Sequence, residues 1–326
     1  MRRHIAIDPA ALTCHYEFLL AGAVCRVATN STILGTVLPA ELAPHLQEAA
    51  GEFTMQVLVS GENSMCSSPP HFRGLHHLVL ATFGPQNIFV FDLARRHVTA
   101  IVSEQLAVNE AFWRTTLLPI ALGVLGAAVG VVPIHCACLT FGGAGILIGG
   151  TSGAGKSTLS VALARDGFDY IADDWTYLSL CSGALIAQGL SIPAKLLPDA
   201  VSYFPELAAY PVRMALNQEL AYEFSVDSIG GHVQRTCNPR FFFLMDRSAA
   251  HGCQFLPMPA TEARSYIDRS IELLPLQLQD QIATRSAIIQ RVLDLSCWRL
   301  SYNGPPSTAV SALRDFLSLR LEDISA

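Results

Sequence analysis

A glycine-rich segment, Gly150–Ser157 with the sequence GTSGAGKS, carries the residue types best suited to chemistry in this chain. It fits the pattern G-x-x-x-x-G-K-[ST], whose glycines let the backbone turn its N–H groups toward an anion. A lysine at the place of Lys156 reaches the outer phosphates of a nucleoside triphosphate, and a hydroxyl at the place of Ser157 binds Mg²⁺. The residues expected to contact the nucleotide are Gly150, Thr151, Ser152, Gly153, Ala154, Gly155, Lys156, Ser157 and Thr158.

The elements around this loop favour the same interpretation. Ile146–Ile148 is a short apolar run that predicts a strand, and Thr158–Asp166 predicts a helix that ends before Gly167, a residue suited to a C-cap. The N-terminus of that helix adds partial positive charge behind the loop. A glycine-rich turn that binds nothing is the alternative, and the order strand, loop, helix argues against it.

Two adjacent carboxylates, Asp173 and Asp174, follow the next predicted strand, 17 residues after Lys156. Phosphoryl transfer needs a metal that neutralises the phosphates and a group that orients or deprotonates the nucleophile. Because adjacent strand residues point to opposite faces, one carboxylate could serve each task. Burial beside the other would raise the pKa of one carboxylate toward the range of a useful base. A pair of aspartates in a surface turn is the alternative.

His135 precedes the strand that leads into the loop. If residues Cys136–Phe141 and Gly145–Gly149 form a hairpin, His135 returns to the phosphate end of the second strand. A lone histidine on an apolar stretch is more often a hydrogen-bonded core residue, and the residues alone favour that interpretation.

The composition indicates a large core and a lightly charged surface, since 51% of the 326 residues are hydrophobic and 15% are charged. The formal net charge is −6, and Lys and Arg form no run longer than a pair, so no nucleic-acid partner is expected. Nine cysteines without a C-x-x-C pattern fit reduced thiols in a cytoplasmic protein better than a disulfide framework or a metal site.

One segment, Leu117–Val132, is almost wholly apolar. It is short for a membrane span of about 20 residues, and it contains Pro119 and three glycines. We therefore expect a buried helix and no membrane span.

The pattern along the chain predicts three parts. Residues 1–105 form a β-rich domain, in which Ser60–Arg73 is a loop and three apolar runs form an antiparallel meander. Residues 106–132 form a helical connector that is broken near Pro119, and residues 133–326 form the domain of the glycine-rich loop. The three runs of the meander are His77–Thr82, Ile88–Leu93 and Val98–Val102.

Further elements are expected in the second domain. Short strands close together, separated by turn residues, indicate antiparallel neighbours. Ser307 is expected to cap a last helix that runs to about Leu319. The predicted strands are Phe168–Ala172, Trp175–Leu180, Ala184–Gln188 and the fully apolar Phe241–Met245.

The segment Ile134–Ala137 and the following GILIGGTSGAGKSTLSVALARDGFDYIADDW, residues 145–175, carry a family resemblance. Together they resemble the catalytic domain of HPr kinase/phosphorylase and, more closely, the wider group of HPr-kinase-like serine kinases, which includes kinases of lasso-peptide precursors. The resemblance implies an α/β fold: a P-loop domain of the HPr kinase and phosphoenolpyruvate carboxykinase type with a mixed sheet. The strand pattern of residues 1–105 predicts a smaller β-rich α+β domain before it.

The resemblance also implies ATP and Mg²⁺ as cofactors and a serine hydroxyl of a peptide or small protein as the acceptor. By position, Asp173 would be the base on the hydroxyl, and Asp174 would assist it and the metal. His135 would sit near the transferred phosphate, and Ser157 would hold Mg²⁺. On this basis His135 changes from a core residue to a candidate catalytic residue.

The chain departs from the bifunctional enzymes of this family in one respect. Between Leu190 and Arg240 it has no Arg-Gly-x-Gly signature, so neither phosphorylase activity nor HPr as the substrate is expected. The cations that could contact phosphate stay open among Arg213, Arg235, Arg240 and Lys195.

Two other functions stay open as well. A small-metabolite kinase would use the same loop with a different acceptor pocket, and a non-catalytic ATP-binding switch would use the loop alone. For the switch, the run FFFLMD at residues 241–246 could supply a Walker-B type of acid. The front domain recognises the acceptor in one interpretation and is a scaffold or homo-oligomer contact in the other.

Overall fold

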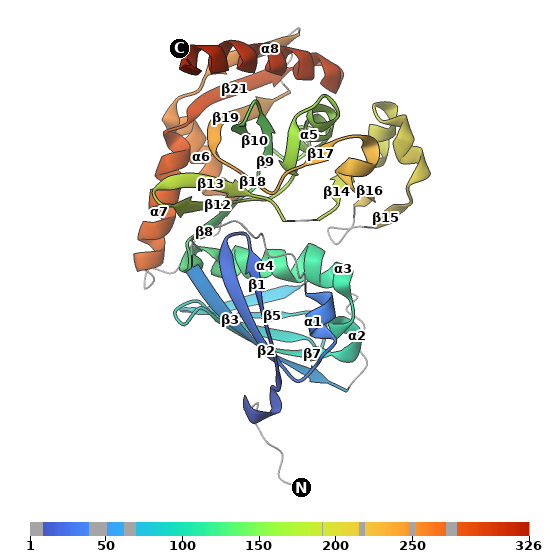
Figure 1. Ribbon diagram of the computed structural model, residues 1–326, viewed down its shortest axis with the longest axis vertical. Coiled ribbons are helices and arrows are strands. Elements are labelled where there is room, and N and C mark those ends of the chain that lie inside the picture. Colours follow the sequence, from blue (N-terminus) through green and yellow to red (C-terminus); the bar gives the residue numbers. More distant parts are fainter. Residues whose placement is uncertain are drawn as a thin grey trace. The chain divides into compact units, whose positions relative to one another are not determined.

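The computed structural model describes residues 9–38, 51–61, 70–190, 192–214, 219–247, 252–271 and 279–325 (Figure 1). The chain divides into two compact units, Met1–Val132 with Leu273–Arg285 and Pro133–Glu272 with Ser286–Ala326. The segment 106–132, expected to connect two domains, lies in the first unit. Helix α7 (Gln279–Leu293) begins in the first unit and ends in the second.

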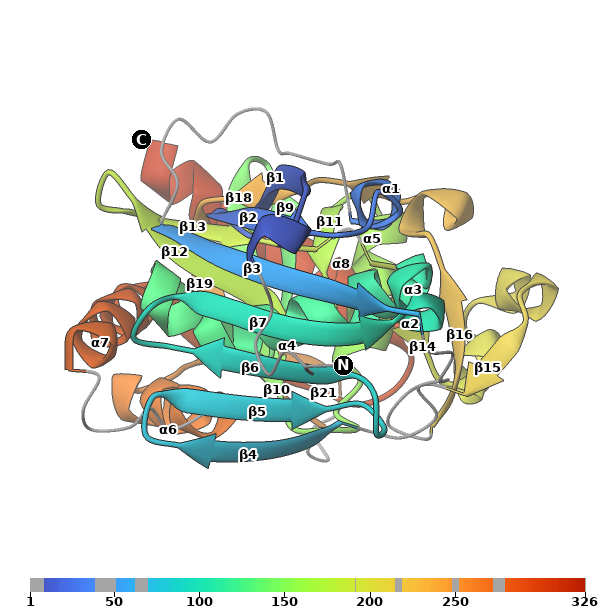
Figure 2. The same ribbon diagram turned by 90° about the horizontal axis from the view of Figure 1, so that it is seen from below.

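The first unit is built on a seven-stranded mixed sheet with the order β1-β2-β3-β7-β6-β5-β4 (Figure 2). Strand β3 pairs in parallel with β2 and β7, and the other neighbours are antiparallel. Alternate residues of β3 are buried, as expected for a sheet with one face on a core. The strands are β1 (Cys14–Leu20), β2 (Ala23–Thr29), β3 (Gly51–Ser60), β4 (His71–Leu75), β5 (Leu78–Thr82), β6 (Ile88–Asp92) and β7 (His97–Ser103).

The predicted meander is confirmed, because β5, β6 and β7 pair in sequence as antiparallel neighbours. The loop predicted over Ser60–Arg73 is partly wrong. Ser60 still belongs to β3, and β4 begins at His71, while residues 62–69 lie outside the described part of the chain. Edge pairing with β5 gives His71–Leu75 a strand conformation that its polar surroundings do not predict.

A long helical run packs on this sheet, with Trp113 meeting Phe89 at a ring-centroid distance of 6.4 Å. The predicted break at Pro119 is wrong, since Pro119 lies in the first turn of α4, where helices tolerate proline. A π-helical turn precedes it. The short helices are η1 (Pro9–Ala11), α1 (Leu34–Val37), α2 (Glu104–Ala107), α3 (Glu110–Phe112), the π turn η2 (Trp113–Leu117), α4 (Leu118–Leu125) and η3 (Gly126–Val129).

Within the described residues, the run Glu110–Val129 is long and apolar enough to cross a membrane by length and composition. Of its most apolar window, 61% is buried inside the protein. That burial fits the predicted core helix.

The second unit contains a seven-stranded mixed sheet with the order β17-β11-β9-β10-β19-β21-β20. Strand β10 pairs in parallel with β19, and β19 pairs in parallel with β21, whereas β9 is antiparallel to both β10 and β11. The predicted mixed α/β architecture and the hairpin of β9 and β10 are confirmed. The strands are β9 (Ala137–Phe141), β10 (Ala144–Gly150), β11 (Asp169–Ala172), β17 (His232–Val233), β19 (Pro239–Asp246), β20 (Cys253–Pro257) and β21 (Ser296–Tyr302).

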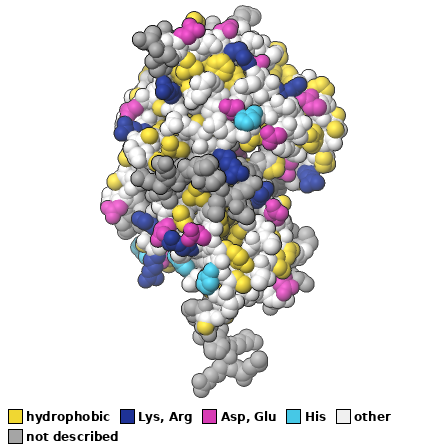
Figure 3. Space-filling view, viewed as in Figure 1, with side chains coloured by type: hydrophobic (Ala, Val, Ile, Leu, Met, Phe, Trp, Pro, Cys, Tyr) yellow, Lys and Arg dark blue, Asp and Glu magenta, His cyan; other side chains and the backbone are white. Residues whose placement is uncertain are grey.

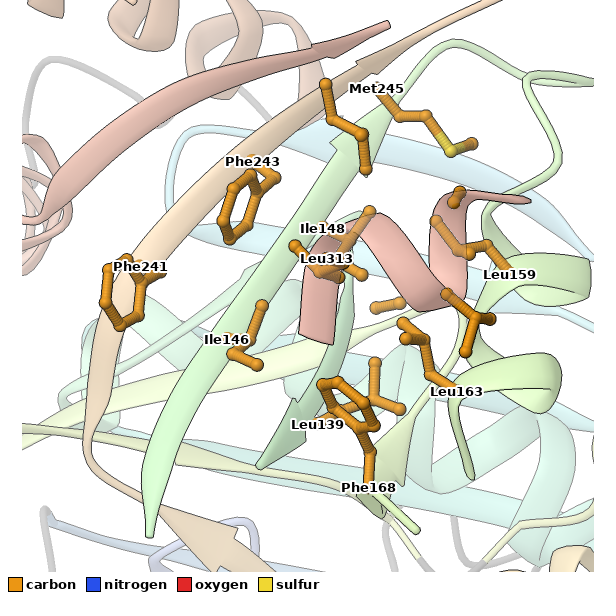
Figure 4. Packing of buried hydrophobic residues seen from close by; sticks show 14 of the residues in the cluster. Leu139, Ile146, Ile148, Leu159, Leu163, Phe168, Phe241, Phe243, Met245 and Leu313 are labelled. Carbon is orange, nitrogen blue, oxygen red and sulfur yellow. The ribbon is translucent and has the colours of Figure 1, made fainter. Parts of the chain in front are cut away.

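Helices cover both faces of this sheet. On one face, Leu159 and Leu163 of α5 (Lys156–Arg165) and Leu313 of α8 (Pro306–Ser325) pack on the central strands (Figure 4). On the other face, Tyr266 of α6 (Ala260–Ser270) lies against Phe242 and fills the space beside Gly149. Because residues of β10 are buried on both faces, the strand that leads to the glycine-rich loop is held in the centre of the core.

Smaller elements complete the second unit. The strands expected at residues 175–180 and 184–188 form an antiparallel pair, β12 and β13. The last helix begins at Pro306 and not after a Ser307 cap, because proline suits a first helical position. A four-stranded sheet contains β18 (Thr236–Cys237), β13 (Ala184–Gln188), β12 (Thr176–Cys181) and β8 (Val131–Ile134), and a three-stranded sheet contains β14 (Ala194–Leu196), β16 (Leu220–Phe224) and β15 (Val212–Met214). Single turns of 3-10 helix are η4 (Pro198–Ser202), η5 (Pro205–Ala209) and η6 (Val226–Ile229).

Candidate active site

The glycine-rich loop joins the end of β10 to the start of α5. Gly153 and Gly155 adopt φ angles of +77° and +90°, a conformation that other residues rarely take. Gly155 is the N-cap of α5 and brings no side chain over the helix terminus. The loop therefore presents its backbone and the positive end of a ten-residue helix, which together suit a bound phosphate.

The Lys156 side chain is folded into this loop. Its Nζ atom donates to the carbonyl oxygen of Gly150 at 2.9 Å and to that of Thr151 at 3.4 Å. The residue is 7% exposed, and burial lowers the pKa of its ammonium group, while the nearby charges of Asp174 and Asp173 act in the opposite direction. The loop thus holds its lysine close to both aspartates.

Asp173 is almost fully buried, with 5% of its surface exposed. The Tyr170 hydroxyl donates to its Oδ1 atom at 2.8 Å, and the Lys195 backbone N–H lies 3.5 Å from its Oδ2 atom. The Ser157 side chain lies near this carboxylate and lowers its pKa slightly. Burial raises the pKa of Asp173, with a smaller contribution from Asp174, and the hydrogen bonds partly offset the rise.

Asp174 points to a different environment. Its side chain is 56% exposed, and its Oδ1 atom lies 2.8 Å from Nε2 of His135. The imidazole ring of His135 packs at a tilt against the indole of Trp175, with ring centroids 5.3 Å apart. His135 is therefore a partner of the acid pair and not the core histidine that the residues alone favoured. The surface-turn alternative for the pair fails too, because Asp173 is buried.

The structure thus brings together His135, Lys156, Ser157, Asp173 and Asp174 at the carboxyl ends of β10 and β11. On the face of the molecule shown in Figure 3, charged side chains of both signs are interspersed and do not gather into a patch of one sign.

Sequence reasoning missed several residues of this region. Tyr170 bonds to Asp173, and Tyr266 donates its hydroxyl to the carbonyl oxygens of His135 and Gly150, which ties the histidine to the end of β10. Arg247 follows β19 and approaches Gly155. The approach of Tyr266 and Arg247 to the loop depends on which distant elements pack together, and no local pattern in the sequence signals that choice.

None of the four cations that the sequence left open is shown with its charged group at the loop. Lys195 contributes its backbone N–H to Asp173, while its Nζ atom pairs with Glu223 at 3.4 Å. Arg213 belongs to the exposed strand β15, and Arg240 belongs to the start of β19, at the end of the strand remote from the loop. Arg235 accepts a bond from Gly189 N–H through its backbone carbonyl.

The residues present fit a nucleotide with Mg²⁺. Within the described ranges, no group of three or more His, Cys, Asp and Glu side chains could hold a metal ion by itself. Mg²⁺ is commonly held by one or two protein oxygens together with the phosphates, and the Ser157 hydroxyl, which lies near Asp173, offers such an oxygen beside the loop. Asp174 has an exposed carboxylate at the same edge.

Comparison with known proteins finds similarity among solved structures. No family model and no curated protein matches the chain. The solved structure of the Hpr(Ser) kinase/phosphatase from Coxiella burnetii aligns with 14% identity and a TM-score of 0.34, over 59% of this chain and 99% of that one. Since identity and TM-score are both low, the case for the chemistry of the site comes from its own side chains.

Proposed function

We propose that this chain is an ATP- and Mg²⁺-dependent kinase that phosphorylates a serine hydroxyl of a peptide or small protein. The observation that carries the proposal is the burial of the Asp173 carboxylate beside the glycine-rich loop, close enough to Lys156 for the two charges to interact. A buried carboxylate next to a loop suited to a triphosphate supports a proton acceptor at the site of transfer.

Asp173 acts as the general base. The seryl oxygen bonds to the γ-phosphorus, the bond from that phosphorus to the oxygen bridging the β-phosphate breaks, and Asp173 takes the hydroxyl proton. Because burial raises the pKa of Asp173, its carboxylate binds a proton more readily than an exposed aspartate does. Tyr170 and the Lys195 N–H fix the carboxylate from two sides, so the base keeps its orientation.

The loop supplies the nucleotide contacts. Its backbone N–H groups and Lys156 hold the β- and γ-phosphates, and Ser157 with Asp174 holds Mg²⁺, which neutralises phosphate charge when bound. Lys156 leaves two carbonyl oxygens for the phosphates, a favourable exchange for a partly desolvated ammonium group. His135 lies near the transferred phosphate on the outer side of the site, with its orientation set by Asp174.

Two alternatives use the same parts. A small-metabolite kinase would share the loop and both acids, and a non-catalytic ATP-binding switch would share the loop. The resemblance of residues 134–175 to serine kinases favours a peptide acceptor. We further propose a cytoplasmic location, in which ATP is available and the eight described cysteines, all free, stay reduced.

The test is an acceptor panel. Wild-type protein with ATP and Mg²⁺ is incubated with serine peptides, matched alanine peptides and small hydroxyl metabolites, and each product is weighed by mass spectrometry. We expect one phosphoryl group on serine peptides. Transfer to metabolites alone would support the metabolite kinase, and binding of ATP without transfer to any acceptor would support the switch.

The base is tested with Asp173→Asn. We expect transfer to fall about a thousandfold while the affinity for ATP changes little, because the base acts in the chemical step. Asp169→Asn, at the opposite end of the same strand β11, is the matched control and should transfer at the wild-type rate. A normal rate for Asp173→Asn would show that another group takes the proton.

A further inference from the structure

Arg247 lies beside the loop on the side away from the acid pair. In the parallel pairing of β19 with β10, Met245 stands opposite Gly150, so Arg247 follows at the level of the glycine-rich loop. A Cβ atom on Gly155 would lie 4.0 Å from Nη1 of Arg247 and 3.8 Å from the Tyr302 hydroxyl. The guanidinium group is therefore next to the last glycine before Lys156.

The arginine is held by the end of the next strand. Its guanidinium carbon lies 4.6 Å from the centroid of the Tyr302 ring, over the face of that ring. Tyr302, at the end of β21, is 1% exposed, so the ring is a fixed support. Stacking on an aromatic face engages the plane of a guanidinium and leaves edge N–H groups for an anion.

The order of the strands indicates which way a bound triphosphate would run across the loop. β11, which carries the acid pair, lies on one side of β10, and β19, which carries Arg247, lies on the other. In a transfer reaction the γ-phosphate must face the base. The phosphates that remain on the nucleoside then extend from the loop toward the opposite side.

We infer that Arg247 binds the α- or β-phosphate, and that the nucleoside leaves the loop on the side of β19 and β21. The inference rests on the proposed function, because only a transfer reaction requires the γ-phosphate to face the acid pair. It assigns to Arg247 a contact that persists in the product, because those phosphates stay on ADP. A contact with the γ-phosphate would instead be lost on transfer.

The experiment compares the affinities of two nucleotides by isothermal titration calorimetry with Mg²⁺, using ADP and a non-hydrolysable ATP analogue. Arg247→Ala should weaken both by the same factor, about tenfold, as expected for the loss of one charge-assisted hydrogen bond. Arg247→Lys, which keeps the charge without the planar fork, should lie between the variant and the wild type. Arg240→Ala removes the same charge from the remote end of β19 and should bind like the wild type.

Each outcome decides the matter. Unchanged affinities in Arg247→Ala, with a wild-type thermal unfolding curve, would overturn the contact. A loss confined to the ATP analogue would overturn the direction, because it would place Arg247 on the γ-phosphate. If the wild-type protein binds neither nucleotide, both this inference and the proposed function are wrong. If Arg247→Ala loses equal affinity for both nucleotides but the wild type phosphorylates no acceptor, the Arg247 contact is supported and only the proposed kinase activity is wrong.

Discussion

The two ends of the large sheet in the second unit carry the same pair of side chains. At the carboxyl end of β11, His135 lies 2.8 Å from Asp174, and at the amino end, His232 lies 2.8 Å from Asp169. By residue type and distance the pairs are equivalent. What surrounds them differs, and the comparison shows that a histidine and an aspartate do not define a catalytic site by themselves.

At the carboxyl end, the pair has a buried aspartate and a buried lysine as neighbours. At the amino end, Asp169 accepts a bond from Thr140 at 2.7 Å, and the His232 side chain is 75% exposed. The difference follows from strand direction, because β10 and β11 both pair with β9 in antiparallel fashion and so end at the same edge. The N-terminus of α5 and the glycine-rich loop also lie at that edge.

After the loss of transfer expected for Asp173→Asn, the next largest effect separates the two histidines. His135→Gln should lower the rate of transfer about a hundredfold, since it removes one preorganised contact with the transferred phosphate. His232→Gln should stay within about twofold of the wild type, as do most surface changes away from a site. Initial rates with ATP and a serine peptide measure both. Equal losses in the two variants would mean that the pairs act through the stability of the fold.

The site residues that lie near the glycine-rich loop along the chain were the ones that could be predicted from the sequence. The loop, Asp173 and His135 lie within one hairpin, one helix and one further strand, so local patterns fix their spacing. Tyr266 and Arg247 reach the loop only through the packing of α6 and the parallel pairing of β10 with β19. Local periodicity does not encode which distant strand becomes a neighbour.

Tyr170 was missed for a different reason. In a regular strand, residues three apart point to opposite faces, so Tyr170 should face away from Asp173. The pairing of β11 with β9 is irregular between Tyr170 and Ala172, and the hydroxyl of Tyr170 reaches the carboxylate beyond the strand end. The same limit applies to the fold. Helices α5 and α8 and the antiparallel pairings of β5 to β7, β9 with β10 and β12 with β13 followed from local signals, whereas the edge strand β4 and the helices α6 and α7 did not.

A smaller effect concerns the pH dependence of the base. The Tyr170 hydroxyl favours the charged form of Asp173, so Tyr170→Phe should raise the pKa of Asp173 beyond the rise that burial already causes. The proposed transfer needs the carboxylate, so the acid limb of the rate profile should move to higher pH, and the rate should fall at acid pH values at which the wild type still transfers phosphate.

Tyr177→Phe is the matched control, since Tyr177 is also a buried tyrosine but lies on β12. Its rate profile should match that of the wild type. The ¹³C chemical shift of the Asp173 carboxyl, followed through a pH titration, reports the same change without an acceptor. An unchanged titration in Tyr170→Phe would show that the hydroxyl does not control the protonation of the base.

The smallest expected effect is a change in the free energy of unfolding. It should be positive for an asparagine at Asp173 and negative for one at Asp169, at the two ends of the sheet. The folded-state pKa of Asp173 is raised above its unfolded value, so the stability that protonation contributes is complete below about pH 4 and is lost as the pH rises through the folded-state pKa. Near neutral pH the buried charge therefore opposes folding. Asp173→Asn should then increase the free energy of unfolding by on the order of 1 kcal/mol at neutral pH, and the gain should vanish in acid.

Asp169→Asn should act the other way. Asp169 accepts from Thr140 on one oxygen and pairs with His232 on the other, and an amide can accept on one side only. We expect a loss of about 1 kcal/mol or less, since His232 is largely exposed. Urea unfolding of both variants and the wild type at neutral and acid pH measures the two changes in the free energy of unfolding. If Asp173→Asn is destabilised at neutral pH, the hydrogen bonds of the carboxylate contribute more to stability than its buried charge costs. The two aspartates would then affect the free energy of unfolding in the same direction, contrary to the expected difference.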